Sequence, residues 1–432
     1  MIETLRNAWK IADLRQKILY TLMILFVVRL GSVIPVPFLD PTTLANMISQ
    51  GGNLLGYLDI LTGGAFARAT LFALSISPYI TSSIVIQLLT VAIPALERLA
   101  KEGEDGKKKL QKYTRYTTVA LAVLESTAFY IMFRNTPGAL IYKDGFSGVL
   151  AAFTIIASFT AGAMLIVWLG ERIDQKGVGN GISLILFAGI VSRGPAAVLK
   201  LWTYLQFGIA GQVSYFFFVP LVVVLFVVLI AFIVLMTNAE RRIPVQYAKR
   251  IVGRKMYGGQ STHIPIKVNM SGVLPVIFAS SFLAIPGTIK GFVDPTASTT
   301  LGKVLGWFDY NTGLYAVLYF LLIIAFNYFY IAVQYNPIEM ANNLRKNSGT
   351  IPGIRPGKPT SDFISKVISK ITLIGALFLA AVAILPILVG AVANMNIALG
   401  GTSIIIVVGV ALDTVRSLES QMMMRHYKGF LE

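Results

Sequence analysis

Two short motifs in this chain resemble catalytic signatures, and neither has the residues that its chemistry needs. Residues 353–358 (GIRPGK) are one residue short of a phosphate-binding loop, lack the Ser or Thr after the lysine, and contain proline where N–H donors are required. Residues 145–148 (GFSG) hold a serine, but no histidine lies in an apolar run to activate it. We therefore expect no enzymatic activity and no catalytic residue.

Side chains that bind metals or undergo redox chemistry are scarce. The chain has no cysteine and only two histidines, His263 and His426, both in polar segments. Disulfides and thiolate metal sites are excluded, and two histidines are too few for a zinc cluster. We expect neither a metal site nor a cofactor.

Ionisable residues inside the apolar runs are nearly limited to Arg29 and Glu125. An unpaired charge at the middle of a membrane costs roughly 2.5 to 3.5 kcal/mol on insertion scales, so each should face protein or water. Glu125 is the residue on which an ion-coupled secondary transporter would rely, and this is our alternative function. A structural acid held by hydrogen bonds is the other interpretation, and one acid without an obvious partner gives weak support for coupling.

The elements that would position any site are membrane spans. The chain is 55% hydrophobic and 13% charged, whereas soluble domains contain about 25% charged residues. Most of its apolar runs approach the ~20 residues that a helix needs to cross a bilayer. We therefore predict an all-α polytopic membrane protein with ten spans, at 18–35, 72–93, 113–133, 149–170, 182–198, 214–236, 272–290, 314–335, 370–392 and 401–416.

The basic residues alternate between the segments outside these spans. Of the 37 Lys and Arg residues, 29 fall in every second outside segment. Short loops rich in Lys and Arg stay in the cytoplasm, so this pattern predicts that both termini are cytoplasmic. Orientation therefore accounts for the net charge of +17 without a nucleic-acid ligand.

Three parts of this pattern are unusual. The run 72–93 carries several hydroxyls and Gln87 beside isoleucines spaced four apart, which favours a helix between protein and water, or one packed against neighbours through small residues. Residues 54–66 are apolar but too short to span, so they predict a re-entrant segment. The basic segments 238–269 and 336–369 are long enough to indicate docking surfaces.

Six ordered sequence motifs carry a resemblance to a known family. They are RLGSVIPVPFLD from Arg29, GGAFARATLFALSISPYITSSIVIQLLT from Gly63, WLGERIDQKGVGNGISLILFAGIV from Trp168, ERRIPVQYAKR from Glu240, STHIPIKVNMSGVLPVIFASS from Ser261 and IPGIRPGKPT from Ile351. In these strings the chain resembles the SecY family of bacterial protein-conducting channels, over essentially its whole length.

The resemblance implies a fold and a pore. Two pseudo-symmetric halves of five helices, 1–199 and 200–432, would form a clamshell around an hourglass pore. The narrow point of this pore would be a ring of aliphatic side chains, and at Leu186 this chain has leucine where the family often has isoleucine. Aliphatic side chains can close around a polypeptide without binding its sequence, and an empty apolar ring resists wetting. The ring would consist of Ile76, Ile80, Leu186, Ile277 and Ile406.

The resemblance also implies a plug and a lateral gate. The plug would be the re-entrant segment at 54–68, including Tyr57, Leu58, Ile60, Leu61, Gly63, Gly64 and Arg68. The gate would open between spans two and three on one side and spans seven and eight on the other. Its polar residues would be Thr81, Gln87, Glu125 and Asn269, with Glu125 at a position where the family commonly has an amide.

The partners implied by the resemblance dock on the cytoplasmic side. The SecA ATPase or the ribosome would bind the two long basic loops through Lys249, Arg250, Arg254 and Arg355. SecE and SecG would complete the complex in the bacterial plasma (inner) membrane. The expected function is to conduct unfolded, signal-bearing secretory polypeptides across the membrane and to release transmembrane segments sideways into lipid.

Overall fold

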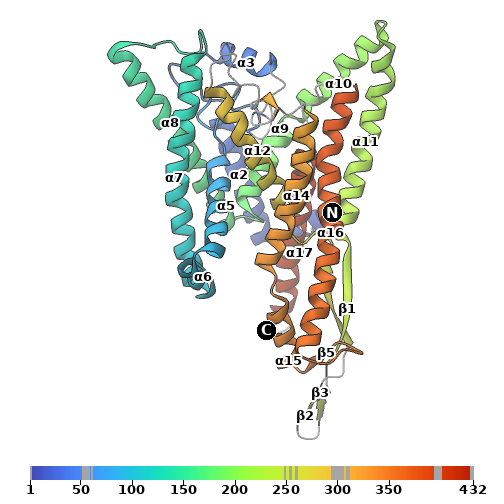
Figure 1. Cartoon of the computed structure of the whole chain (residues 1–432). Coiled ribbons are helices and arrows are strands. Elements are labelled where there is room, and N and C mark those ends of the chain that lie inside the picture. The colour runs from blue at the N-terminus through green and yellow to red at the C-terminus, as the bar shows by residue number, and fades with distance from the viewer. Residues whose placement is uncertain are drawn as a thin grey trace.

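The computed structural model describes residues 2–50, 59, 62–247, 250–252, 255–257, 261–292, 306–307, 312–393 and 401–428. Long helices run side by side, and strands project from one end of them (Figure 1). The first group of helices comprises α1 (Ile2–Lys10), α2 (Ala12–Gly31), α3 (Pro41–Gln50), α5 (Ser77–Ala92), α6 (Pro94–Lys101), α7 (Glu104–Asn135), α8 (Gly145–Lys176) and α9 (Gly181–Ser192). The second comprises α10 (Gly194–Ile209), α11 (Val213–Asn238), α12 (Leu274–Phe292), α14 (Gly313–Gln334), α15 (Pro337–Lys346), α16 (Lys358–Ala393) and α17 (Gly401–Lys428).

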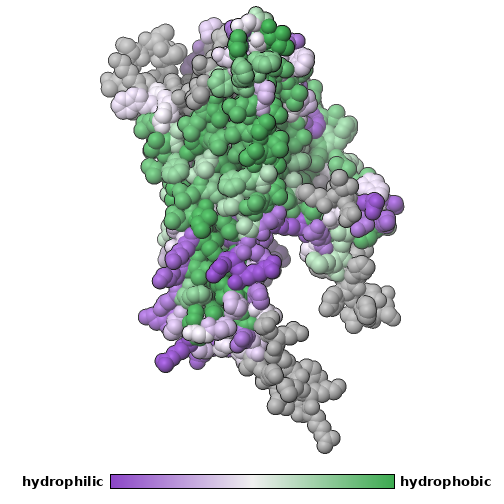
Figure 2. Space-filling view, turned by 90° about the vertical axis from the view of Figure 1, so that its right-hand side faces the viewer, coloured by the Kyte–Doolittle hydropathy of each residue, from purple (hydrophilic) through white to green (hydrophobic). Residues whose placement is uncertain are grey.

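The helices are long and apolar enough to form a polytopic membrane protein. Within the described residues seven helices meet the length and hydropathy needed to cross a membrane, or eight if the bent pair α5 and α6 is one span. Each of the ten predicted spans overlaps a helix. The runs 18–35 and 272–290 overlap α2 and α12, which are not among the seven or eight helices that meet the spanning criteria. Figure 2 shows a broad hydrophobic band, with hydrophilic residues gathered at the end that carries the strands.

The second predicted span starts later than its apolar run. Residues 62–76 form turns, and α5 begins only at Ser77. Ser75 has a φ of 50°, which a helix cannot contain, and Pro78 occupies the first turn of α5, where its missing N–H costs nothing. At its other end α5 meets α6 at a bend of 103°, with Pro94 directly after the break. The predicted start at residue 72 is therefore wrong by about one helical turn.

The cytoplasmic segment predicted at 238–269 contains strands that hydropathy did not predict. Strand β1 (Glu240–Tyr247) pairs antiparallel with β4 (Ser261–Lys267), and β1 also pairs with β5 (Gly349–Thr350) from the segment 336–369. Ile243 and Val245 alternate with exposed residues, so one face of β1 is buried. Strands β2 (Arg250–Val252) and β3 (Lys255–Tyr257) form a second antiparallel pair. One three-stranded sheet thus joins both predicted docking segments.

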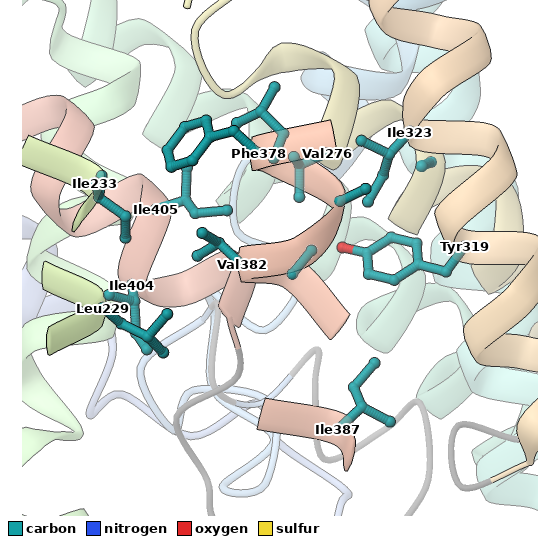
Figure 3. Close-up of a cluster of buried hydrophobic side chains, with 14 of the residues drawn as sticks. Leu229, Ile233, Val276, Tyr319, Ile323, Phe378, Val382, Ile387, Ile404 and Ile405 are labelled. Carbon is teal, nitrogen blue, oxygen red and sulfur yellow. The ribbon is translucent and has the colours of Figure 1, made fainter. Parts of the chain in front are cut away.

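The largest buried apolar cluster lies among α11, α12, α14, α16 and α17. Ile323, Leu379 and Val276 are fully buried in it, and Figure 3 shows side chains from these helices converging. A separate cluster among the earlier helices contains Phe133 and Phe159, whose rings are in tilted contact. The helices therefore pack around more than one apolar core.

The pore ring, plug seat and docking sheet

The five residues predicted for the pore ring share one cluster of contacting side chains. They come from four places: Ile76 and Ile80 at the start of α5, Leu186 on α9, Ile277 on α12 and Ile406 on α17. Ile76, Leu186 and Ile406 are buried, whereas Ile80 and Ile277 are partly buried against them. Segments from both ends of the chain therefore meet at this cluster. All five of the predicted ring side chains in it are aliphatic.

Only part of the predicted plug falls in the described residues. Tyr57, Leu58, Ile60 and Leu61 lie outside them. Gly63 and Gly64 have φ values of 66° and 89°, in the left-handed region that glycine adopts without strain. A Cβ on Gly63 would lie 2.7 Å from Nη1 of Arg29 and 2.8 Å from Oγ of Ser192. The two glycines therefore let the backbone approach α2 and the end of α9 closely.

An ion pair with a buried carboxylate joins this segment to the rest of the protein. Asp59 is 5% exposed and its carboxylate pairs with Arg193, between α9 and α10. Oδ1 of Asp59 also accepts a hydrogen bond of 2.8 Å from the N–H of Ala67. Arg68 is exposed. Sequence analysis missed the pair because Asp59 and Arg193 are far apart in the chain, although both are charges in otherwise apolar surroundings.

The helices expected to flank the lateral gate are in contact. Helix α12 touches both α5 and α7. Thr81 and Gln87 on α5 are half-buried, as is Glu125 on α7. Ser82, beside Thr81, donates a hydrogen bond of 2.7 Å to the carbonyl of Thr114 on α7. The structure therefore brings the predicted gate helices together and joins α5 to α7 by one of the hydroxyls of the run 72–93, in line with packing against a neighbouring helix.

Asn269 lies in the turn between β4 and α12. Its Oδ1 is buried and has no hydrogen-bond partner among the described residues. It lines a cavity of about 340 Å³ that Ile405, Lys267 and Arg416 also border. In the same turn, Ser271 donates a hydrogen bond to Asn327 on α14, whose amide donates one of 3.0 Å to the carbonyl of Thr372 on α16.

A second ion pair outside the predicted site residues joins α7 to α8. Nε and Nη2 of Arg115 donate hydrogen bonds of 2.8 and 2.7 Å to the two carboxylate oxygens of Glu171. Nε2 of Gln111 donates a third, of 3.3 Å. The Glu171 side chain is 11% exposed, so its charge depends on these donors. Arg115 and Glu171 each lie near a basic segment of the chain. Nothing in the sequence indicates that these two residues pair.

Of the predicted docking residues, the structure describes Arg355 and Arg250, which lie at the end of the molecule that carries the strands. Arg355 is exposed in the turn before α16, between Gly353 and Gly357, whose φ values are 80° and 104°. Its carbonyl accepts a hydrogen bond of 2.8 Å from Oγ1 of Thr360, which fixes the turn. Arg250 belongs to β2, whereas Lys249 and Arg254 lie outside the described residues.

Comparisons with known proteins agree on one family. A family model described as SecY matches residues 70–415. The protein translocase subunit SecY of Streptomyces coelicolor is 44% identical over 445 residues, covering 100% of both chains. The SecY subunit of Streptomyces galbus is 42% identical over 449 residues, also covering 100% of both chains.

Solved structures show the same fold. This chain is similar to a structure described as that of a protein conducting channel, with a TM-score of 0.65, 18% identity, and 94% and 92% of the two chains covered. It is also similar to a SecY studied for its plug domain, with a TM-score of 0.63, 19% identity, and the same coverage. Sec61 from a canine ribosome-channel complex gives a TM-score of 0.61 at 18% identity, again over 94% and 92%.

These matches favour a channel over the ion-coupled transporter that Glu125 had raised as the alternative. The relatives are bacterial, and the helices of this chain make it a multi-pass membrane protein. With a family model over residues 70–415 and full-length relatives above 40% identity, the chain belongs to the SecY family of protein translocase subunits.

Proposed function

We propose that the polypeptide path runs between residues 1–199 and residues 200–432, through the ring of Ile76, Ile80, Leu186, Ile277 and Ile406. The single observation that carries this assignment is that these residues, from α5, α9, α12 and α17, meet in one aliphatic cluster. Such a ring closes around an unfolded chain without hydrogen-bonding to it and stays dry when empty. The chain is then a passive channel whose driving energy comes from a partner.

The segment at 54–68 is the plug in this proposal. Gly63 and Gly64 bring its backbone against α2 and α9, and Phe72, a few residues on, packs in the same cluster as Ile76 and Ile406. One of the solved channels of similar fold is described as having a plug domain that stabilises its closed state and maintains a membrane seal. The lateral gate lies where α12 meets α5 and α7, with Thr81, Gln87, Glu125 and Asn269 nearby.

The docking partners are the SecA ATPase and the ribosome, and SecE and SecG complete the complex. The exposed Arg355 turn and the β1–β4 hairpin form the surface for them, on the cytoplasmic side with both termini. Similar channels have been solved in complexes with ribosomes, which supports this assignment. Ribosomal RNA is a polyanion, so dense Lys and Arg also speed the encounter.

Transport by the reconstituted chain tests the main proposal. Vesicles that contain this chain with SecE and SecG should import a signal-bearing precursor when SecA and ATP are supplied. Arg355→Ala should reduce import without changing the amount of assembled complex. If the complete complex moves no precursor, the proposed function is wrong.

Substitution of Ile277 tests the ring. A polar side chain in Ile277→Ser lets water enter the constriction, so idle channels should conduct ions. Ile277→Leu keeps the position apolar and is the matched control, which should leave the idle conductance at background. Equal conductance in the two variants would place the seal elsewhere.

A further inference from the structure

The seat of the plug segment holds more positive than negative charge. Arg193 pairs with Asp59, and its Nε is buried without a partner among the described residues. Nη1 of Arg29 lies on the other side of Gly63, and the charges of Arg29 and Arg193 repel each other. Among the described residues Asp59 is the acid that pairs at this seat, and it pairs with Arg193, while Arg29 lies beside Gly63 and has the positive charge of Arg68 near it as well.

The carboxylate belongs to the part that is proposed to move. Asp59 is held in the plug segment itself, since its carbonyl accepts hydrogen bonds from the N–H of Gly64 at 2.8 Å and from Oγ1 of Thr62 at 3.1 Å. Arg29 belongs to α2 and Arg193 to the junction of α9 and α10, which are parts of the bundle. When the plug segment leaves, Asp59 and Arg68 leave with it, while Arg29 and Arg193 remain without an acid from this segment.

Leaving the arginines alone is unfavourable. Removing one partner of a buried ion pair leaves a charge that has lost its counter-charge in a poorly solvated place. The seat adjoins the cluster that contains the proposed ring: Val28, one residue before Arg29, and Ile190, three before Arg193, both belong to it. In the proposed path, a polypeptide that crosses the ring therefore comes close to the ends of α2 and α9 that carry these two arginines.

We propose that Arg29 and Arg193 form a carboxylate-binding site, occupied by Asp59 at rest and by Asp or Glu side chains of the translocating polypeptide during transport. This inference rests on the proposed path and plug. Acidic segments replace the lost counter-charge and stabilise the displaced plug, whereas Lys and Arg segments are repelled. The site thereby makes passage sensitive to the charge of the cargo.

Three precursors that differ in one short segment of the mature region test this site. The segment consists of Glu, Gln or Lys, and import is measured in reconstituted vesicles without a membrane potential, which would itself act on charged segments. With the unmodified chain the Glu precursor should cross faster than the Lys precursor by about tenfold. In the double variant Arg29→Gln with Arg193→Gln this ratio should fall to near one.

Two further variants keep the test decisive. Arg134→Gln removes an exposed arginine at the end of α7 and should leave the ratio unchanged. Arg193→Lys retains the charge and should retain most of the ratio even if folding tolerates Gln poorly.

If the ratio of Glu precursor import to Lys precursor import is unchanged in the double variant, the carboxylate site is wrong. The channel function still stands in that case, provided that the Gln precursor is imported. If the Gln precursor fails to enter with the unmodified chain as well, the proposed function itself has failed.

Discussion

Helices α5, α7 and α8 are joined by polar side chains, whereas α11, α12, α14, α16 and α17 surround an apolar core. The first group uses Ser82 to Thr114, Arg115 to Glu171, and Ser126 to Thr160 at 3.2 Å. The second buries the largest aliphatic cluster and is also crossed by hydrogen bonds, among them Tyr319 to Thr402, Asn327 to the Thr372 carbonyl, and Arg416 to Asn238. Hydroxyls and charges can exchange their partners for water, but an apolar core cannot. The first group therefore holds an ion pair whose partners water can replace, whereas the second holds the largest apolar core.

The largest effect should come from the apolar core. Ile323→Ala removes a fully buried side chain from α14 and leaves a cavity, which should cost about 4 kcal/mol of unfolding free energy. Denaturant unfolding in detergent micelles measures this loss. A cost below that of the polar variants described next would reverse the contrast between the two helix groups.

The ion pair between α7 and α8 should rank second. Arg115→Ala leaves the Glu171 carboxylate, which is 11% exposed, with only Gln111 as a side-chain donor among the described residues. Because the Arg115 side chain is 46% exposed, we expect a loss of about 2 kcal/mol rather than the larger value of a fully buried pair. Arg115→Ala with Glu171→Gln is the control, and it should recover part of the stability. A double variant less stable than the single one would contradict the ion-pair explanation.

The polar link inside the apolar group sharpens the comparison. Asn327 is 1% exposed and joins the turn at Ser271 to Thr372. Asn327→Leu leaves the buried Ser271 hydroxyl without its acceptor, which should cost about 1.5 kcal/mol. Ser271→Ala in the same background removes the stranded hydroxyl and should restore stability. No restoration would mean that Asn327 acts through its shape and not through hydrogen bonds.

The smallest effect should be seen at the hydroxyl between α5 and α7. Ser82→Ala removes bonds to the Thr114 carbonyl and to Oγ1 of Thr117, both 2.7 Å, and should cost about 0.6 kcal/mol. Ser83→Ala on the exposed face is the matched control and should be neutral. If Ser82→Ala matched Ile323→Ala in cost, α5 and α7 would form a rigid core of their own.

Much of the helical layout could be predicted because apolar runs long enough to span a membrane have few other structures open to them. The contact of Ile76, Leu186 and Ile406 followed from the family resemblance, since isolated aliphatic residues carry no signal of which core they join. The strands β1 and β4 were missed because the exposed arginines 241 and 242 conceal the alternation of Ile243 and Val245. Local hydropathy does not report such pairing.

The ion pairs could not be predicted for a different reason. Asp59 with Arg193 and Arg115 with Glu171 join residues from separate elements, and their proximity depends on how the helices pack. The late start of α5 depends on the positive φ of Ser75, for which serine gives no warning in the sequence. The ion pair and the backbone turn near the proposed plug segment thus depend on tertiary contacts.

The short strand β5 gives the proposed docking surface a mechanical property. Tyr247 of β1 pairs with Gly349 of β5, while β4 pairs along the other edge of β1, so segments that lie a hundred residues apart in the chain share one sheet. A partner that binds either segment therefore exerts force on both, and this force is transmitted to α11 and α16 together. Two weak contacts with such a sheet act as one bivalent interaction, whose affinity falls sharply if either contact is removed.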